Sequence, residues 1–95
     1  MPKVKPLHSR SGAVKNQYII LDGDKEYFQS YDSIIVKIDH SVKLKGTHKS
    51  QVYLDINTWN YSRTTSKYRT QFLGEGTDAT KAKIASGEYM LVDLN

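Results

Sequence analysis

The sequence W-N-Y-S-R-T-T-S-K-Y-R-T-Q-F-L at residues 59–73 predicts a helix and the way that helix packs. It holds the single Trp of the chain and two of its seven Tyr. Successive residues of a helix lie about 100° apart, so the aromatic and basic side chains of this stretch fall on different faces. One face carries Tyr61, Thr65, Tyr68 and Phe72, and the opposite face carries Arg63, Lys67 and Thr70. We therefore expect the aromatic face, together with Trp59, to pack against the core, because large rings gain most from burial.

Capping residues bound this helix and predict a second one. Asn60 or Ser62 can accept hydrogen bonds from the free N–H groups at the start, and Gly74 suits the left-handed conformation that often ends a helix. Thr77-Asp78-Ala79 opens a shorter helical stretch that runs to Ser86 and is followed by Gly87. The chain is thus expected to carry one main helix and one short helix.

Strand signals lie on both sides of the two helices. Runs of β-branched, aromatic and other apolar residues predict strands at residues 17–21, 26–29, 34–38, 51–56 and 89–94. Asp22-Gly23 is typical of a tight hairpin turn between the first two strands. In the third strand, alternation places Ile34, Val36 and Ile38 on one face and Ile35 and Lys37 on the other. Between residues 39 and 50 the chain either extends a hairpin through Val42 and Leu44 or forms a loop.

The order of these elements indicates an α+β protein. We expect a small antiparallel sheet of four to five strands, with the main and the short helix packed on one face. Residues 1–16 contain two Pro, one Gly and several cations without any period, which predicts a flexible basic N-terminal segment. Residues 17–95 are expected to form a single domain.

Composition limits the possible partners and locations. The chain of 95 residues has a net charge of +4 and a pI of about 9.3, which favours an anionic partner; simple solubility is the alternative explanation. It has no Cys, which excludes disulfides and thiolate metal sites. It also lacks the run of roughly 18–20 apolar residues that a membrane span requires. We expect a protein of the cytoplasm that does not bind membranes.

Three segments resemble a group of small uncharacterised proteins of phages and mobile elements. They are Lys15-Asn16-Gln17-Tyr18-Ile19-Ile20, Glu26-Tyr27-Phe28-Gln29-Ser30-Tyr31-Asp32-Ser33-Ile34-Ile35 and Trp59-Asn60-Tyr61-Ser62-Arg63-Thr64-Thr65-Ser66-Lys67-Tyr68. The group shares an F-x-S-Y strand and a W-[DN]-Y-S-x-T-T helix start, and the resemblance covers roughly residues 15 to 73. Residues 39–50 are longer than the connection usual in the group, and the tail after Gly74 lies outside the shared pattern. The resemblance implies a phage-encoded accessory protein in the cytoplasm of a host bacterial cell, and it assigns no catalytic residues.

The residues that could carry out chemistry are not arranged for it in the sequence. His8, His40 and His48 lack the helical spacing of a metal-binding pair. Gly74-Glu75-Gly76 lacks the lysine of a phosphate-binding loop, and no Gly-x-Ser-x-Gly elbow occurs. We therefore expect a protein that is not an enzyme and uses neither a metal nor a cofactor.

Two basic clusters are the candidate partner-binding or anion-binding residues. The first lies at the start of the predicted main helix and consists of Ser62, Arg63, Thr64, Lys67 and Arg69. Free N–H groups, hydroxyls and cations at a helix start can hold a phosphate or a carboxylate. The second cluster lies in the connection that precedes the fourth strand and consists of Lys43, Lys45 and Lys49 together with His48. A plain solvated face and a charged loop that protects a sheet edge are the alternatives. Exposed tyrosines at Tyr27, Tyr31 and Tyr53 would add a binding surface if the helices leave that face of the sheet uncovered.

Two functions follow from these observations. The first is a non-enzymatic accessory protein that binds, and inhibits or modulates, a host or anti-phage-defence protein with an acidic surface. The second is a small basic nucleic-acid-binding protein, whose affinity would fall steeply with salt. Either protein could act as a monomer or as a homodimer formed through exposed sheet edges.

Overall fold

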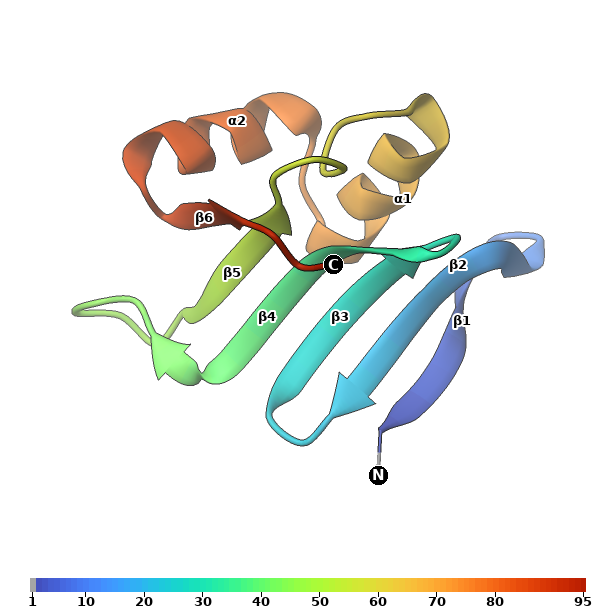
Figure 1. Ribbon diagram of the computed structural model, residues 1–95, viewed down its shortest axis with the longest axis horizontal. Coiled ribbons are helices and arrows are strands. Elements are labelled where there is room, and N and C mark those ends of the chain that lie inside the picture. Colours follow the sequence, from blue (N-terminus) through green and yellow to red (C-terminus); the bar gives the residue numbers. More distant parts are fainter. Residues whose placement is uncertain (1) are drawn as a thin grey trace.

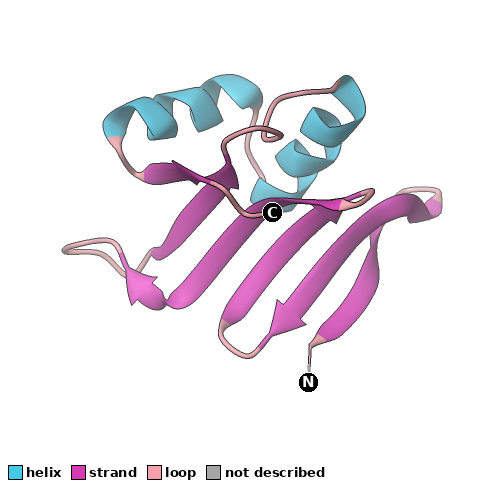
Figure 2. Cartoon of the chain, in the orientation of Figure 1, coloured by secondary structure: helices cyan, strands magenta, loops and turns pink. Residues whose placement is uncertain are grey.

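Six strands and two helices are present in residues 2–95, the part of the chain that the computed structural model describes (Figures 1 and 2). The strands are β1 (Lys3–Ser9), β2 (Gly12–Asp22), β3 (Lys25–Ser30), β4 (Ser33–Lys43), β5 (Ser50–Asp55) and β6 (Tyr89–Val92), and the helices are α1 (Arg63–Leu73) and α2 (Thr77–Ser86). The predicted α+β class is confirmed.

The strands form one sheet in the order β1-β2-β3-β4-β5-β6. Neighbours from β1 to β5 pair antiparallel, whereas β5 and β6 pair parallel, with Val52 opposite Tyr89 and Leu54 opposite Leu91. The sheet is therefore mixed and has six strands, not the four to five antiparallel strands that the sequence predicted. The reason is the connection: α1 and α2 return the chain to the end of the sheet where β5 began, and a crossover of that kind sets the next strand parallel.

The N-terminal residues belong to the sheet, which differs from the flexible segment expected at residues 1–16. β1 pairs with β2 from Lys3 opposite Leu21 to Ser9 opposite Gly12, with a bulge near Leu7. Only Leu7 of this edge strand is buried, so the sequence shows no alternating hydrophobic pattern that would predict a strand. Main-chain hydrogen bonds to β2 can hold such a strand without that pattern. Residue 1 lies outside the described residues.

Both helices begin and end close to the predicted positions. Ser62 is the N-cap of α1, and its Oγ accepts a hydrogen bond from the Thr65 N–H at 3.1 Å. Gly74 and Gly87 end α1 and α2 in the left-handed region, with φ of 73° and 84°. α2 has the bounds that the sequence predicted, Thr77 to Ser86, and with 10 residues it is nearly as long as α1, which has 11.

The core lies between the helices and the adjoining face of the sheet. Phe28, Ile35, Val36, Val52, Leu54 and Tyr89 are its buried members. The rings of Phe28 on β3 and Phe72 on α1 stack with centroids 5.7 Å apart. Trp59 and Tyr68 also pack against this cluster, as predicted. Tyr61 does not, because it precedes the cap of α1 and its side chain is 53% exposed.

A bulge in β4 changes which side chains enter the core. Phe28 pairs with Val36 and Gln29 pairs with Ile34, which leaves Ile35 without a partner on β3. An extra residue of this kind interrupts the strict alternation of a strand. Ile35 and Val36 are accordingly both fully buried, whereas the sequence placed them on opposite faces.

The other face of the sheet is not covered by the helices, which lie together on one side (Figure 1). Phe28 points towards α1, so its neighbours Tyr27 and Gln29 point to the opposite side. The register carries that side across all six strands, and we call it the open face. Its central residues are Val4, Tyr18, Ile20, Tyr27, Gln29, Lys37, Tyr53 and Met90.

Candidate functional site

The start of α1 forms a shallow hollow of about 350 Å³, which we call the α1 hollow. Its lining residues are Asn60, Tyr61, Ser62, Arg63 and Ser66. Two of its hydroxyls are already engaged: Ser62 Oγ caps the helix, and Ser66 Oγ donates to Asn60 Oδ1 at 2.9 Å. Arg63 is exposed, and as the charged residue of the first turn it adds a cation to the positive end of the helix. The hollow therefore suits a small anionic group.

Two further predicted residues continue the surface of this hollow beyond Ser62 and Arg63. Thr64 and Lys67 are exposed on the outer side of α1. The Nζ of Lys67 lies 5.2 Å from the centre of the Tyr68 ring, which holds the cation along the helix. Gln71, one turn beyond Lys67, donates from Nε2 to the carbonyl of His8. Residues i and i+4 share a helix face, so this bond turns the Lys67 side of α1 towards the end of β1.

Arg69 is not available to a partner, and its prediction as a binding residue was wrong. The side chain is 0% exposed, and its guanidinium lies 5.2 Å from the centre of the Trp59 ring. Nη1 donates to the carbonyl of Trp59 at 2.5 Å, and Nη2 donates to Thr77 Oγ1 at 2.7 Å. Burial lowers the pKa of Arg69, an effect that the carboxylate of Glu75 opposes. Arg69 thus joins the loop before α1 to the start of α2.

The lysine cluster occupies a hairpin at another part of the molecule. β4 extends to Lys43, and Leu44 N–H donates to the Lys49 carbonyl at 2.9 Å, so residues 39–50 form a hairpin and not an open loop. Lys43, Lys45 and Lys49 are all exposed. In Figure 1 this hairpin and the start of α1 lie at opposite ends of the molecule, so the fold does not combine the two basic clusters.

The acidic residues are distributed differently from the basic ones. Asp39 and Asp55 are buried, and Glu75 is largely so. Burial alone would raise the pKa of Asp55, but hydrogen bonds from the Leu94 N–H and the Thr58 hydroxyl outweigh it and lower the pKa. Asp39 accepts from the Ser41 hydroxyl, which lowers the pKa of Asp39. Within residues 2–95, the buried charged side chains are the acids Asp39 and Asp55 and the cation Arg69, while Glu75 is largely buried in its pair with Lys83. The exposed surface is therefore more basic than the net charge alone suggests.

Glu75 is the centre of a polar cluster that connects both helices to β6. Its Oε1 accepts from Lys83 Nζ at 2.7 Å and from the Tyr89 hydroxyl at 2.5 Å, and its Oε2 accepts from Thr80 Oγ1 at 3.0 Å. Burial alone would raise the pKa of Glu75, but these donors lower it. Burial, followed by the bond to Glu75, raises the pKa of Tyr89 to about 12. All of these groups satisfy one another, which indicates a structural role.

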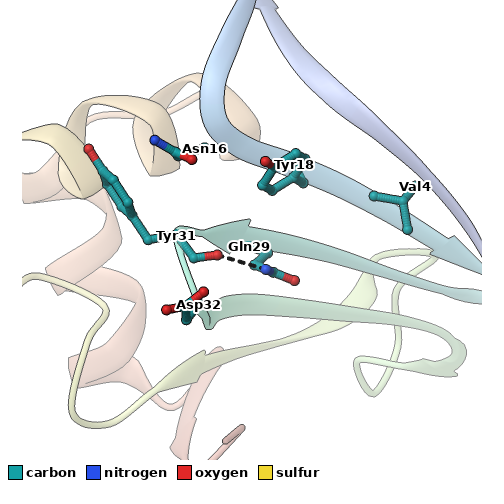
Figure 3. A pocket seen from close by; sticks show the side chains of 6 residues that line it. All are labelled: Val4, Asn16, Tyr18, Gln29, Tyr31 and Asp32. Atoms are coloured by element: carbon teal, nitrogen blue, oxygen red, sulfur yellow. Dashed lines mark hydrogen bonds between the residues drawn. The ribbon is translucent and has the colours of Figure 1, made fainter.

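A second hollow, of about 540 Å³, lies at a corner of the open face (Figure 3), and we call it the corner hollow. Its lining residues are Val4, Asn16, Tyr18, Gln29, Tyr31 and Asp32. Tyr31 N–H donates to the Asn16 carbonyl at 2.7 Å, which joins the β3–β4 turn to β2. Asn16 and Tyr31 have φ of 65° and 54°, in the left-handed region of backbone conformation that residues other than glycine adopt uncommonly. Of these residues, the sequence analysis proposed only Tyr31 for a binding surface, as one of several tyrosines on the outer face. The left-handed conformations of Asn16 and Tyr31 could not be predicted from the sequence pattern.

The rest of the open face carries tyrosines beside a cation. Lys37 Nζ lies 5.5 Å from the centre of the Tyr53 ring, and Tyr27 is the neighbour of Lys37 on β3. Within residues 2–95, no group of three or more His, Cys, Asp and Glu side chains is placed to hold a metal ion. In that same range, no helix has the length and apolar character needed to cross a membrane.

The arrangement of sheet and helices defines the class of protein: a small α+β protein whose sheet has one face covered by helices and one open face. The chain belongs to a family described as "Family of unknown function (DUF8033)", which matches residues 2–89. This match includes β1, α2 and the beginning of β6, and so extends beyond residues 15–73 on both sides. No curated protein and no solved structure matches the chain.

Proposed function

We propose that the protein is a non-enzymatic binding protein and that its partner presents an acidic surface. The observation that supports this most directly is the separation of charge. Asp39, Asp55 and Glu75 are engaged inside the fold, whereas Arg63 and Lys67 are exposed on the outer side of α1. Cations exposed next to the α1 hollow can pair with carboxylates of a partner through charge-assisted hydrogen bonds. Desolvated charge pairs at such a contact add specificity as well as affinity.

The biological setting is proposed from the resemblance of residues 15–73 to small phage and mobile-element proteins. In that setting the protein is an accessory factor in the bacterial cytoplasm that inhibits or modulates a host or anti-phage-defence protein. Occlusion of an acidic surface is the simplest mechanism, because it requires no catalytic group. The protein would act as a monomer or as a homodimer.

The test compares binding between two charge-matched variants. Tagged wild-type protein, Arg63→Ala/Lys67→Ala and Lys45→Ala/Lys49→Ala are used to capture proteins from host lysate, with quantitative mass spectrometry as the readout. We expect a partner that is retained by wild type and by the hairpin variant but is lost from the α1 variant. Purified partner should then bind the α1 variant at least roughly tenfold more weakly, which corresponds to about 1.4 kcal/mol. Equal capture by all three proteins would contradict the proposal.

Nucleic-acid binding is the second candidate, and the open face is the observation that favours it. Tyr27 and Tyr53 lie on either side of the strand that carries Lys37, and tyrosine rings beside a cation can stack on unpaired bases. The measurement is retention on single-stranded DNA or RNA as the salt concentration rises. Affinity that falls steeply with salt and is lost in Tyr53→Ala would support this function over the first. Absence of retention at low salt would remove it.

A further inference from the structure

The corner hollow has a chemistry different from that of the α1 hollow. Of its six lining residues, one is charged, and that residue is the acid Asp32. The Gln29 amide donates from Nε2 to the Tyr31 carbonyl at 2.7 Å, which fixes the amide and leaves its oxygen as an acceptor. In Figure 3, Tyr18 and Tyr31 stand on either side, Asn16 lies along one rim, and Gln29 and Asp32 lie along the other. The hollow is thus rich in acceptors and walled by aromatic rings.

This composition excludes some ligands and favours others. A phosphate binds best beside cations, and this lining contains no cation and carries the Asp32 carboxylate, which would repel it. A planar cation with many N–H groups complements it, because its donors can reach the Asp32 carboxylate and the Gln29 oxygen while its face lies against tyrosine rings. A guanidinium has this shape and its charge does not depend on pH in the physiological range. The volume of about 540 Å³ is also sufficient for an extended arginine side chain.

The backbone gives an independent reason to regard the hollow as functional. Tyr31 is the first residue of a two-residue turn between β3 and β4, with φ of 54° and a side chain that is 50% exposed. Glycine is preferred at such a position in hairpins. Asn16 holds a similar conformation directly opposite, linked through the bond from Tyr31 N–H. Strained residues that converge on one cavity are typical of binding sites, where the surrounding structure maintains the strain.

We propose that the corner hollow binds an arginine side chain of a partner polypeptide, with Asp32 as the ion-pair acceptor, Gln29 as a second acceptor and Tyr18 and Tyr31 as the aromatic walls. This goes beyond the proposed function, because it concerns a different hollow and a ligand of opposite charge. Its test and the α1 test therefore fail independently. A partner that satisfied both would present an arginine within a largely acidic surface.

The experiment is an NMR titration of ¹⁵N-labelled protein with N-acetyl-arginine amide. We expect saturable shifts in the backbone and side-chain amides of residues 16–18 and 29–33, with millimolar affinity. The matched ligand is N-acetyl-citrulline amide, a neutral analogue of the same shape, which should bind at least roughly tenfold more weakly because the charged hydrogen bond is lost. Adenosine and cytidine monophosphate test the nucleobase alternative.

Three variants complete the design. Asp32→Asn should weaken binding of the arginine analogue roughly tenfold, whereas Asp22→Asn, which removes the same charge at the far end of β2, should not change it. Tyr31→Gly should abolish saturation while retaining the dispersed spectrum of a folded protein. Equal binding of citrulline and arginine, tighter binding of either nucleotide, or unchanged affinity in Asp32→Asn would overturn the proposal.

Discussion

Tyr31 is a single residue whose backbone conformation destabilises the folded protein. Its left-handed backbone, with φ of 54°, costs a residue with a side chain on the order of 1 kcal/mol relative to glycine. We predict that Tyr31→Gly raises the free energy of unfolding by about 0.5–1 kcal/mol, measured by urea denaturation. Tyr61→Gly is the matched control, since Tyr61 is similarly exposed at 53% but has no positive φ, and it should be neutral or destabilising. If both variants lose stability equally, Tyr31 is not strained.

Individual residues also show where sequence reasoning reaches its limit. Ser62, Gly74 and Gly87 were identifiable because capping depends on a few neighbouring residues. Ile35 was misplaced because the β4 bulge depends on the pairing with β3, which the local sequence does not encode. Arg69 was misjudged as a surface cation, although its spacing of four from the buried Thr65 places both on one helix face. That spacing could have indicated that Arg69 is buried.

At the scale of elements, Arg69 is what fixes α1 against its neighbours. It connects the carbonyl of Trp59 before the helix with Thr77 at the start of α2. We predict that Arg69→Ala lowers the free energy of unfolding by about 3 kcal/mol, because it leaves a cavity and unpaired buried acceptors. Arg69→Lys should recover only part of this loss, since an ammonium cannot reproduce the planar fork.

The control for this prediction lies on the same helix. Arg63→Ala removes an equal charge from the exposed side of α1 and should change stability by no more than about 0.5 kcal/mol. Both variants are compared by urea denaturation in the same buffer. Similar losses in Arg63→Ala and Arg69→Ala would mean that charge, and not the buried contacts, determines the effect.

The strands illustrate a second limit at this scale. β3, β4 and β5 were predicted from their patterns because one of their faces is buried in the core. β1 was missed since it is an edge strand with a single buried residue, and edge strands are held mainly by main-chain hydrogen bonds. The parallel setting of β6 was also missed, because it depends on where two helices return the chain.

At the scale of the whole molecule, the buried carboxylates make stability depend on pH. The folded-state pKa of Glu75 lies below its ordinary value of 4.5, and that of Asp55 below 3.8. The unfolded chain therefore binds protons first as the pH falls. The stabilising contribution of these groups is present above about pH 4.5 and is lost progressively on acidification through the folded-state pKa values.

We predict that the free energy of unfolding falls between neutral pH and about pH 3.5, and that Glu75→Gln reduces this difference. Tyr89→Phe keeps the carboxylate but removes one of its donors, so its pH dependence should lie between those of wild type and Glu75→Gln. Urea denaturation at the two pH values measures all three proteins. A pH dependence identical in wild type and Glu75→Gln would show that Glu75 does not contribute to it.

The stacking of Arg69 on Trp59 has a practical consequence for observing this protein. Trp59 is the only tryptophan of the chain, so its fluorescence comes from one known place. It precedes the α1 hollow directly and lies 5.2 Å from the guanidinium of Arg69. The emission wavelength and intensity therefore report on that junction without an added label. The intrinsic fluorescence of Trp59 can therefore be used to follow binding at the surface where the acidic partner is proposed to dock.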